Sequence, residues 1–398
     1  MSYLGRTLTA MTIVLLGACS NGYEIPKQLP GSGSSSDEKL DYYGDEAQRV
    51  SIPKYYDMVL AYGGSPHRKA SSTWDTDRIK DYLLYEDQAG EKHLLFDAFL
   101  FLEFMYSGQY NGVVATERAF ADGYGLNSAH KEDWQALIDY YFEKTGLNTE
   151  IAPLDALEQA YAEVSDELGL KDRKLGVVIF IPEPIITEGP NSQLSVYWGN
   201  LDGEAMNFHE TEDRIKAVKW YVDSIRERFY AKNYRHIELG GFYWVAETAS
   251  TSSEILKPVG DYLSSLKYSF NWIPYFGAEG YYRWAEFGFN TAYLQPNYFF
   301  NLNTPVSQLD DACQLARKYN MNLEMEFDDT LLNDSVKADR LRSYMKYFKE
   351  YGAWETQNMA YYVGDDAVRN MKYSTNDNVH SLYYEFCDWL ITRPVRKF

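Results

Sequence analysis

Short apolar runs alternate with helical patterns along most of the chain. Eight runs have the length and composition of strands, and we predict strands at residues 56–63, 94–102, 177–182, 236–245, 270–276, 291–295, 322–329 and 359–363. The third run is apolar throughout, as a strand buried on both faces should be. Helical patterns separate the runs, and we predict helices at residues 76–85, 132–144, 153–168, 215–229, 281–287, 304–319, 335–351 and 379–391, with a capping-box pattern at 251–254 opening a further one.

Eight strands, each followed by a helix, are typical of the (β/α)8 barrel, also called the TIM barrel. A doubly wound open sheet is the competing interpretation. It usually has fewer units and often carries a glycine-rich phosphate loop, which this sequence lacks. We find neither a second linker nor a repeat in the body of the chain. The sequence therefore predicts a single α/β barrel domain over residues 51–398.

The first eighteen residues have the pattern of a signal peptide. One basic residue, Arg6, precedes an apolar stretch at 11–16, and small residues then lead to Cys19. This ending resembles the lipobox of bacterial lipoproteins. The resemblance implies that residues 1–18 are removed and that Cys19 is lipidated as the new N-terminus. A simple secretory signal cleaved after Ala18 is the alternative.

A polar segment rich in glycine, serine and acidic residues follows at 31–38. Such a composition cannot bury enough apolar surface to fold, so we predict a flexible tether over residues 19–50. Together with the lipid on Cys19, the tether would hold the barrel at the bacterial outer membrane. Both the cell surface and the periplasmic face are allowed.

The charge balance narrows the class of partner. The chain has 58 acidic and 38 basic residues and a net charge of -20, which argues against nucleic acid or another anionic polymer. Neutral or cationic ligands remain. Aromatic residues make up 16% of the chain, and amphipathic aromatic rings stack well on sugars. Carbohydrate, as an oligo- or polysaccharide, is the ligand class indicated, although tyrosine-rich cores also occur without any ligand.

The remaining cysteines and the histidines indicate no redox or metal chemistry. Cys313 and Cys387 lie among apolar residues of non-consecutive predicted helices, so we favour two buried free thiols over a disulfide. The six histidines show no HExxH or other ligand spacing. We therefore predict no cofactor and no metal. Asp328 and Asp329 are expected to cap the following helix, with calcium binding as the alternative.

The seventh predicted strand, at 322–329, separates apolar from acidic side chains. Because a strand alternates its side chains, its apolar residues share one face and the other face carries Glu324, Glu326 and Asp328. Acids are rarely buried unless they are paired. In a barrel the acidic face would point into the lumen, with Glu326 nearer than Glu324 to the carboxyl-terminal mouth, where barrel enzymes carry their chemistry.

A second acid, Glu247, follows the fourth predicted strand. Acids at the ends of strands four and seven resemble the arrangement of many barrel glycoside hydrolases, in which one carboxylic acid protonates the leaving oxygen and another carboxylate attacks the sugar or activates water. This resemblance implies that Glu247 is the acid/base and Glu326 the nucleophile or base. Those enzymes often have Asn before the strand-four acid, whereas this chain has Ala246.

Structural roles are the alternatives for these acids. Glu247 could be a solvated or helix-capping carboxylate, and Glu326 could be a lumen acid paired with Arg or Lys. For Glu324, one layer deeper, the structural role is favoured, with substrate binding as its functional alternative.

Further polar and aromatic residues at strand ends are candidates for substrate binding. The acids that could bind sugar hydroxyls are Asp57, Asp97 and Glu183. The amides that could do so are Gln295 and Asn297. The aromatic candidates for stacking on sugar are Trp198, Tyr243, Trp244, Tyr275, Tyr293 and Tyr298. Packing without ligand contact is the alternative for each aromatic residue.

Four segments, at 240–244, 272–276, 293–297 and 323–326, together resemble a family of bacterial lipoproteins known only as a domain of unknown function, number 4855. The resemblance covers about residues 55–391. It implies a barrel of glycan-handling type but brings no established catalytic residues. We therefore expect a membrane-anchored glycoside hydrolase acting on a neutral or weakly cationic glycan. A non-catalytic glycan-binding lipoprotein that captures polysaccharide is the alternative.

Overall fold

The computed structural model describes residues 49–62, 73–106, 109–110, 113–114, 118–122, 127–145, 150–170, 172–186, 197–364 and 366–397. The predicted signal peptide, Cys19 and nearly all of the predicted tether lie outside the described residues. In the part of the chain that is described, no helix is both long enough and apolar enough to cross a bilayer.

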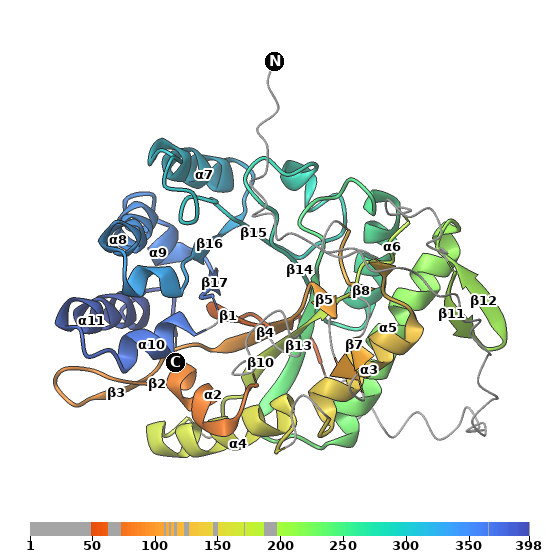
Figure 1. Cartoon of the computed structure of the whole chain (residues 1–398), viewed down its shortest axis with the longest axis horizontal. Coiled ribbons are helices and arrows are strands. Elements are labelled where there is room, and N and C mark those ends of the chain that lie inside the picture. Colours follow the sequence, from red (N-terminus) through yellow and green to blue (C-terminus); the bar gives the residue numbers. More distant parts are fainter. Residues whose placement is uncertain are drawn as a thin grey trace. The chain divides into compact units, whose positions relative to one another are not determined.

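Eight parallel strands close into a barrel, so the predicted fold is confirmed (Figure 1). Each strand pairs with the next along the chain, and the last pairs with the first. The barrel strands are β1 (Asp57–Tyr62), β4 (Ala98–Leu102), β10 (Leu175–Ile181), β13 (Ile237–Trp244), β14 (Ser269–Trp272), β15 (Thr291–Leu294), β16 (Asn322–Glu326) and β17 (Met359–Tyr362).

The second barrel strand begins later than predicted. Leu94 belongs to a separate antiparallel hairpin of β2 (Leu84–Glu86) and β3 (Lys92–Leu94). The run from 94 to 102 is apolar except for Asp97, so periodicity alone did not separate the two elements. Other short strands lie in the loops: β5 (Met105–Tyr106), β6 (Gln109–Tyr110), β7 (Val113–Val114), β8 (Arg118–Ala119), β9 (Asn127–Ser128), β11 (Tyr197–Leu201) and β12 (Glu204–Asn207).

Helices surround the barrel (Figure 1). They are α2 (Thr76–Leu83), α3 (Lys131–Phe142), α4 (Pro153–Leu168), α5 (Thr211–Ala231), α6 (Ser253–Ser265), α7 (Ser307–Lys318), α8 (Ser335–Glu350), α9 (Ala353–Thr356), α10 (Ala367–Lys372) and α11 (Asp377–Ile391). The helix predicted at 281–287 is wrong, because only a 3-10 turn, η2 (Tyr281–Arg283), forms there. Gly280 and Gly288, both at positive φ, bound the segment, so a helix there could not extend past either residue.

Strand β16 divides its faces as predicted. On the apolar face Phe327, just past the strand, meets Phe386 of α11 with ring centroids 5.1 Å apart. Glu324 and Glu326 are buried on the other face and line a pocket in the barrel. The hydrophobic contact with the helical ring therefore fixes which way the carboxyl groups point.

At the amino-terminal end of the barrel, the ring of Tyr55 packs directly against the backbone of two strands. Tyr55 lies beneath the strands, and a Cβ added to Gly240 would come 2.0 Å from its hydroxyl oxygen. A Cβ added to Gly176 would come 2.4 Å from the same ring. Only glycine leaves room for this tyrosine at both positions.

Cys313 and Cys387 are buried and free, which confirms the predicted thiols. Burial raises the pKa of the Cys313 thiol to about 12. It also raises the pKa of Cys387 well above its usual value. Neither thiol is therefore a reactive thiolate at neutral pH.

Candidate active site

A pocket of about 310 Å³ lies at the carboxyl-terminal end of the barrel strands. Six of its lining residues are among those predicted from the sequence: Tyr243, Glu247, Gln295, Asn297, Glu324 and Glu326. The other six were not predicted: Leu60, Tyr62, Phe104, Ile273, Phe300 and Tyr362. The structure therefore brings the two proposed catalytic acids to one site, with both candidate amides beside them.

Glu326 is held by hydrogen-bond donors from two neighbouring elements. Its side chain is 1% exposed. The backbone N–H of Asn297 donates to Oε2 over 2.6 Å, and the hydroxyl of Tyr344 on α8 donates to the same oxygen over 2.7 Å. Burial raises the pKa of Glu326 to about 7, with a further rise from Glu247, while the two donors oppose it. The group is therefore partly ionised at neutral pH.

Tyr344 was not predicted as a site residue. It lies in the middle of α8, on the buried face of an ordinary amphipathic helix, and nothing in its sequence position distinguishes it from a core residue. Only the packing of α8 against β16 brings its hydroxyl to Glu326.

Glu324 lies deeper in the same pocket and is 2% exposed. Within the described part of the chain, no side chain or backbone group donates a hydrogen bond to it and no cation pairs with it. Its burial raises its pKa well above the ordinary value, and the like charges of Glu326 and Glu247 raise it further. Burial and the neighbouring acids therefore favour the protonated form of Glu324 when the pocket holds no ligand.

Two amide side chains link Glu247 to Glu326. Gln295 donates from Nε2 to Glu247 Oε1 over 2.9 Å and to the carbonyl of Ile273 over 2.8 Å. Asn297 donates from Nδ2 to Gln295 Oε1 over 3.3 Å and to Glu326 Oε1 over 3.4 Å. The carbonyl of Ile273 fixes the orientation of the first amide, which in turn orients the second. Both carboxyl groups are therefore positioned by one network.

Asn297 has a left-handed backbone, with φ at +50°. Non-glycine residues adopt this conformation rarely, although Asn tolerates it better than most. Here it turns the backbone N–H toward Glu326, while the side-chain Oδ1 accepts from the N–H of Phe276 over 2.9 Å. The unusual conformation therefore coincides with a contact to a candidate catalytic acid.

A row of aromatic rings forms another part of the pocket lining. Tyr62 meets Tyr362 edge to face at 5.5 Å and lies 6.1 Å from Phe104. Tyr362 also meets Phe300 edge to face at 5.6 Å. Phe300 is 42% exposed, so it stands at the rim. The pocket thus combines three carboxyl groups with four linked rings, and no Lys, Arg or His is among the lining residues that the structure describes.

Asp57 and Asp97 do not reach this pocket, so the expectation that they bind sugar is wrong. Both lie at the closed end of the barrel and are fully buried. Asp57 is ion-paired with Arg393 and accepts from the hydroxyl of Tyr361 over 2.6 Å. Asp97 accepts from backbone N–H groups and pairs with Arg173 over 2.8 Å. The two acids lie at the beginning of their strands, which is the end of the barrel opposite the pocket.

Tyr293 also belongs to the closed end. It lines a separate cavity of about 810 Å³, together with Met58 and Asn271. Burial raises its pKa, and the nearby charges of Asp97 and Asp57 raise it further. Its distance from the mouth follows from the register of the strands, because Tyr293 pairs with Asn322, the first residue of β16.

Glu183 and Trp198 have structural contacts away from the pocket. Glu183 accepts from the hydroxyls of Thr251 and Ser252, each over 2.5 Å. Ser252 therefore does not cap α6 with its side chain, although α6 begins where the capping pattern predicted. Trp198 is 1% exposed and packs in an aromatic cluster against Trp134. Neither residue can contact a ligand in the pocket as expected.

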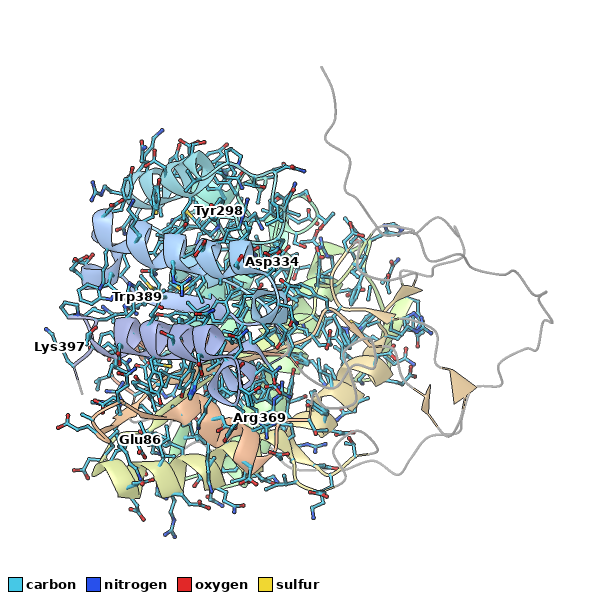
Figure 2. All side chains as sticks on the ribbon, turned by 60° about the vertical axis from the view of Figure 1, so that its left-hand side comes forward. Glu86, Tyr298, Asp334, Arg369, Trp389 and Lys397 are labelled. Carbon is cyan, nitrogen blue, oxygen red and sulfur yellow. The ribbon has the colours of Figure 1, made fainter. Side chains whose placement is uncertain are left out.

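Three further aromatic candidates also lie outside the pocket lining. Trp244 follows inward-facing Tyr243, so strand alternation turns it outward onto Phe270, and it is fully buried. Tyr298, which is labelled in Figure 2, is buried. Its ring centroid lies 5.9 Å from that of Tyr344 on α8. Tyr275 is half-buried, and its backbone forms an isolated parallel β-bridge with that of Gln295. The expectation that these three rings stack on sugar is therefore not supported by their placement.

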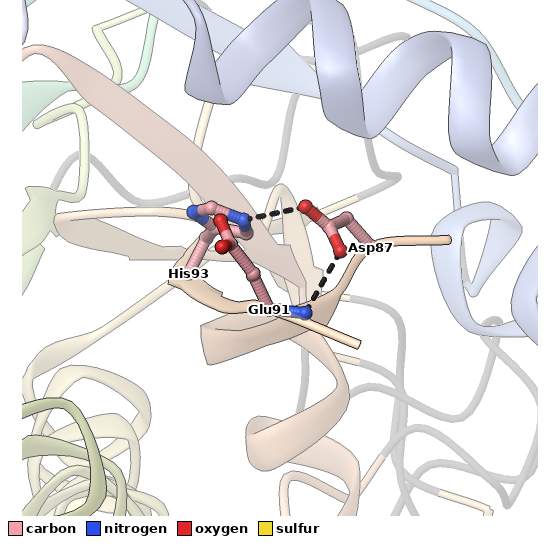
Figure 3. A group of neighbouring side chains, drawn as sticks. All are labelled: Asp87, Glu91 and His93. Carbon is pink, nitrogen blue, oxygen red and sulfur yellow. Dashed lines mark hydrogen bonds and ion pairs between the residues drawn. The ribbon is translucent and has the colours of Figure 1, made fainter. Parts of the chain in front are cut away.

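One group in the described part of the chain could offer three ligand atoms to a metal ion: Asp87, Glu91 and His93 (Figure 3). Asp87 and Glu91 lie in the turn of the β2–β3 hairpin, and His93 lies in β3. Asp87 accepts from the N–H of Glu91 over 2.8 Å and contacts His93 Nε2 over 3.1 Å. These hydrogen bonds within the hairpin account for the closeness of the three side chains without a metal ion. Separately, Asp328 accepts from the N–H of Thr330 and caps the 3-10 turn η3 (Asp329–Leu332). The prediction that Asp328 and Asp329 cap the following helix is wrong, because Asp334 caps α8.

Comparison with solved structures gives distant likenesses. The GH18 chitinase ChiB from the chitin utilization locus of Flavobacterium johnsoniae is 12% identical, with 84% of this chain and 95% of that chain covered and a TM-score of 0.40. TsXylA, an intracellular xylanase from Thermoanaerobacterium saccharolyticum solved with xylotetraose, is 10% identical, with 78% and 85% covered and a TM-score of 0.37. At these values neither likeness says what this chain acts on.

A search of curated protein sequences found no match. A family model, in contrast, matches residues 57–388, from the first barrel strand to the last helix. The match spans the whole barrel, including every residue that lines the pocket. The chain belongs to the family described as Domain of unknown function (DUF4855).

Proposed function

We propose that the protein is a membrane-anchored glycoside hydrolase that cleaves a neutral or weakly cationic glycan. One observation carries the proposal: Glu247 and Glu326, from the ends of β13 and β16, line one pocket and are joined through Gln295 and Asn297. A pair of carboxyl groups in different environments is the arrangement that glycosidic bond cleavage requires.

In this mechanism Glu247 acts as the acid/base. It is half-buried at the mouth, where a glycosidic oxygen can approach it, and it would protonate the leaving oxygen. No Asn precedes it, since Ala246 occupies that position, but Gln295 on the neighbouring strand supplies an amide contact. Although Ala246 replaces the usual Asn, Glu247 is therefore still positioned by a hydrogen bond from Gln295.

Glu326 acts as the nucleophile or as the base that activates water. The Tyr344 hydroxyl and the Asn297 N–H both donate to its Oε2, and such donors favour the ionised form. Because its pKa is about 7, a substantial fraction is ionised at neutral pH. The same donors fix the carboxyl plane, which orients it toward the bound sugar.

The test is a panel of neutral and amino-substituted glycans assayed for newly released reducing ends. Glu326→Gln and Glu247→Gln should each lower the activity of the parent by a hundredfold or more. Glu279→Gln, which changes an exposed acid outside the pocket, is the matched control and should keep full activity. Unchanged activity in both pocket variants would exclude the assigned pair.

Glycan capture without catalysis is the second candidate. It is favoured by the linked rings of Tyr62, Tyr362 and Phe300, which offer apolar faces to a sugar whether or not the acids react. Binding by the parent protein with no reducing ends released from any bound glycan would favour this function.

The membrane anchor rests on the lipobox pattern that ends at Cys19. We expect the protein to be acylated there and held at the outer membrane, at the cell surface or on the periplasmic face. Metabolic labelling with a fatty-acid analogue should mark the parent and not Cys19→Ala, and the variant should leave the membrane fraction. Labelling of the variant would refute lipidation at this cysteine.

A further inference from the structure

Glu324 differs from the other buried acids described above. Asp57 is paired with Arg393, Asp97 with Arg173, and Glu183 accepts from two hydroxyls. Glu324 is as deeply buried as these, yet no group in the described chain donates to it. A buried carboxyl without a partner lowers stability, and the mechanism proposed above gives Glu324 no role.

The surroundings of Glu324 favour a cation. Among the described residues, the titratable groups that line the pocket around it are Glu326 on the same strand, Glu247 after β13, and the hydroxyls of Tyr62, Tyr243 and Tyr362. Tyr344 on α8 also interacts with it electrostatically. All of these are acids or neutral phenols. A cationic group would relieve the repulsion among the three carboxyl groups, whereas a uronic or sulfated sugar would add to it.

The aromatic rings suit the same ligand. Tyr62, Tyr362, Phe300 and Phe104 present linked rings in the same pocket. The face of an aromatic ring attracts a cation as well as the apolar face of a sugar, and the attraction grows when the site is desolvated. A ligand that joins a positive charge to a sugar ring uses both parts of the pocket.

The size of the pocket limits the ligand further. Its volume of about 310 Å³ is at the lower end of the range for small-molecule sites, roughly 300–1,000 Å³. We therefore expect a single sugar ring in it and little space for a bulky substituent on that ring. An acetyl group on the amine would both fill space and remove the charge.

We propose that this pocket binds a sugar unit with a free, protonated amino group, and that Glu324 receives the amine. The ligand class is an amino sugar without an N-acyl group, within an oligo- or polysaccharide. The proposal rests on the proposed function only in taking the pocket as a glycan site. It holds whether or not the bound glycan is cleaved.

Binding should change the protonation of the pocket. Burial and the acidic neighbours of Glu324 raise its pKa, which favours the protonated carboxyl when the pocket is empty. An ammonium group beside it lowers that pKa, so amine binding should release a proton. A neutral sugar of the same shape should release none. Affinity for the amine should also fall from pH 7 to pH 5, as the carboxyl groups become protonated.

The experiment is isothermal titration calorimetry with three β-1,4-linked oligosaccharides of equal length: glucosamine, N-acetylglucosamine and glucose oligomers. Glu247→Gln is used as the background, so that binding is measured without turnover. We expect the glucosamine oligomer to bind at least tenfold more tightly than either of the others. Repeating the titration in buffers with different ionisation enthalpies should reveal proton release for that ligand alone.

Glu324→Gln in the same background is the decisive variant. It preserves the shape of the side chain and should abolish both the tenfold preference and the proton release, while affinity for the glucose oligomer stays within about threefold of the background. Thermal unfolding checks that the variant is folded, and Glu279→Gln serves as the control. Equal affinity for the three oligosaccharides, or a preference that survives Glu324→Gln, would overturn the proposal.

The outcomes also separate this proposal from the proposed function. If the parent protein binds the glucosamine oligomer selectively but releases no reducing ends, the hydrolase is refuted and the amine site stands. If the parent cleaves a neutral glycan and shows no preference for the amine, the hydrolase stands and the amine site is refuted.

Discussion

Replacing Glu326 by glutamine should stabilise the protein at neutral and alkaline pH while removing its activity. Burial raises the pKa of this carboxyl from an ordinary value of 4.5 to about 7. An acid with a raised pKa favours the folded state only in its protonated form. The contribution of Glu326 to the free energy of unfolding is therefore fully present below pH 4.5 and is lost as the pH rises through 7. Glutamine does not titrate and avoids that loss.

The magnitude follows from the size of the pKa difference. At 1.36 kcal/mol for each pKa unit, ionising Glu326 lowers the free energy of unfolding by about 3 kcal/mol. Linkage places about 2.5 kcal/mol of this between pH 5 and pH 8. The hydrogen bonds that glutamine loses or keeps add a constant that cancels when the two pH values are compared. The pKa of Glu324 should fall in the variant, since it loses a like charge, and this acts in the same direction.

The assay is urea unfolding of the parent and Glu326→Gln at pH 5 and at pH 8. The variant should gain about 2.5 kcal/mol relative to the parent between the two conditions. Glu279→Gln, an exposed acid, should show no such pH-dependent gain. If the difference between Glu326→Gln and the parent is the same at both pH values, the raised pKa is refuted.

Two further predictions concern single contacts. Tyr344→Phe removes a donor that lowers the pKa of Glu326, so the acidic limb of the kcat/KM profile should move to higher pH, whereas Tyr347→Phe on the same helix should leave it unchanged. An unmoved limb would mean that the hydroxyl does not tune this acid. Gly240→Ala places a Cβ against Tyr55 and should lower the free energy of unfolding by about 1–3 kcal/mol in urea titrations. Full stability in that variant would show that the closed end of the barrel can relax.

The sequence predicted the barrel because its signal is local. Each strand carries its own apolar run, and eight such runs separated by helical patterns leave few alternatives. The errors arose where local signals merge or are interrupted. The run from residue 94 spans both β3 and β4, and glycines at positive φ cut short the helix predicted at 281–287.

The candidate site was predicted only in part. The two acids and two amides lie at or just after the last residues of their strands, where a barrel places its mouth, so strand counting was sufficient to find them. The aromatic candidates were mostly wrong because a ring at a strand end is as well suited to packing as to binding. Trp244 faces the helices and Trp198 lies in a separate cluster, whereas Tyr62 and Tyr362 form the aromatic lining.

The sequence by itself determined the strand order and the direction in which alternate side chains point, because both follow from the period of a strand and the order of elements along the chain. Only the tertiary structure decided how deep each inward side chain lies. Asp57 and Glu326 both point inward, but Asp57 opens its strand and meets Arg393, whereas Glu326 ends its strand and meets Tyr344. Depth and partner depend on the register between strands and on the packing of distant helices, which no local pattern encodes.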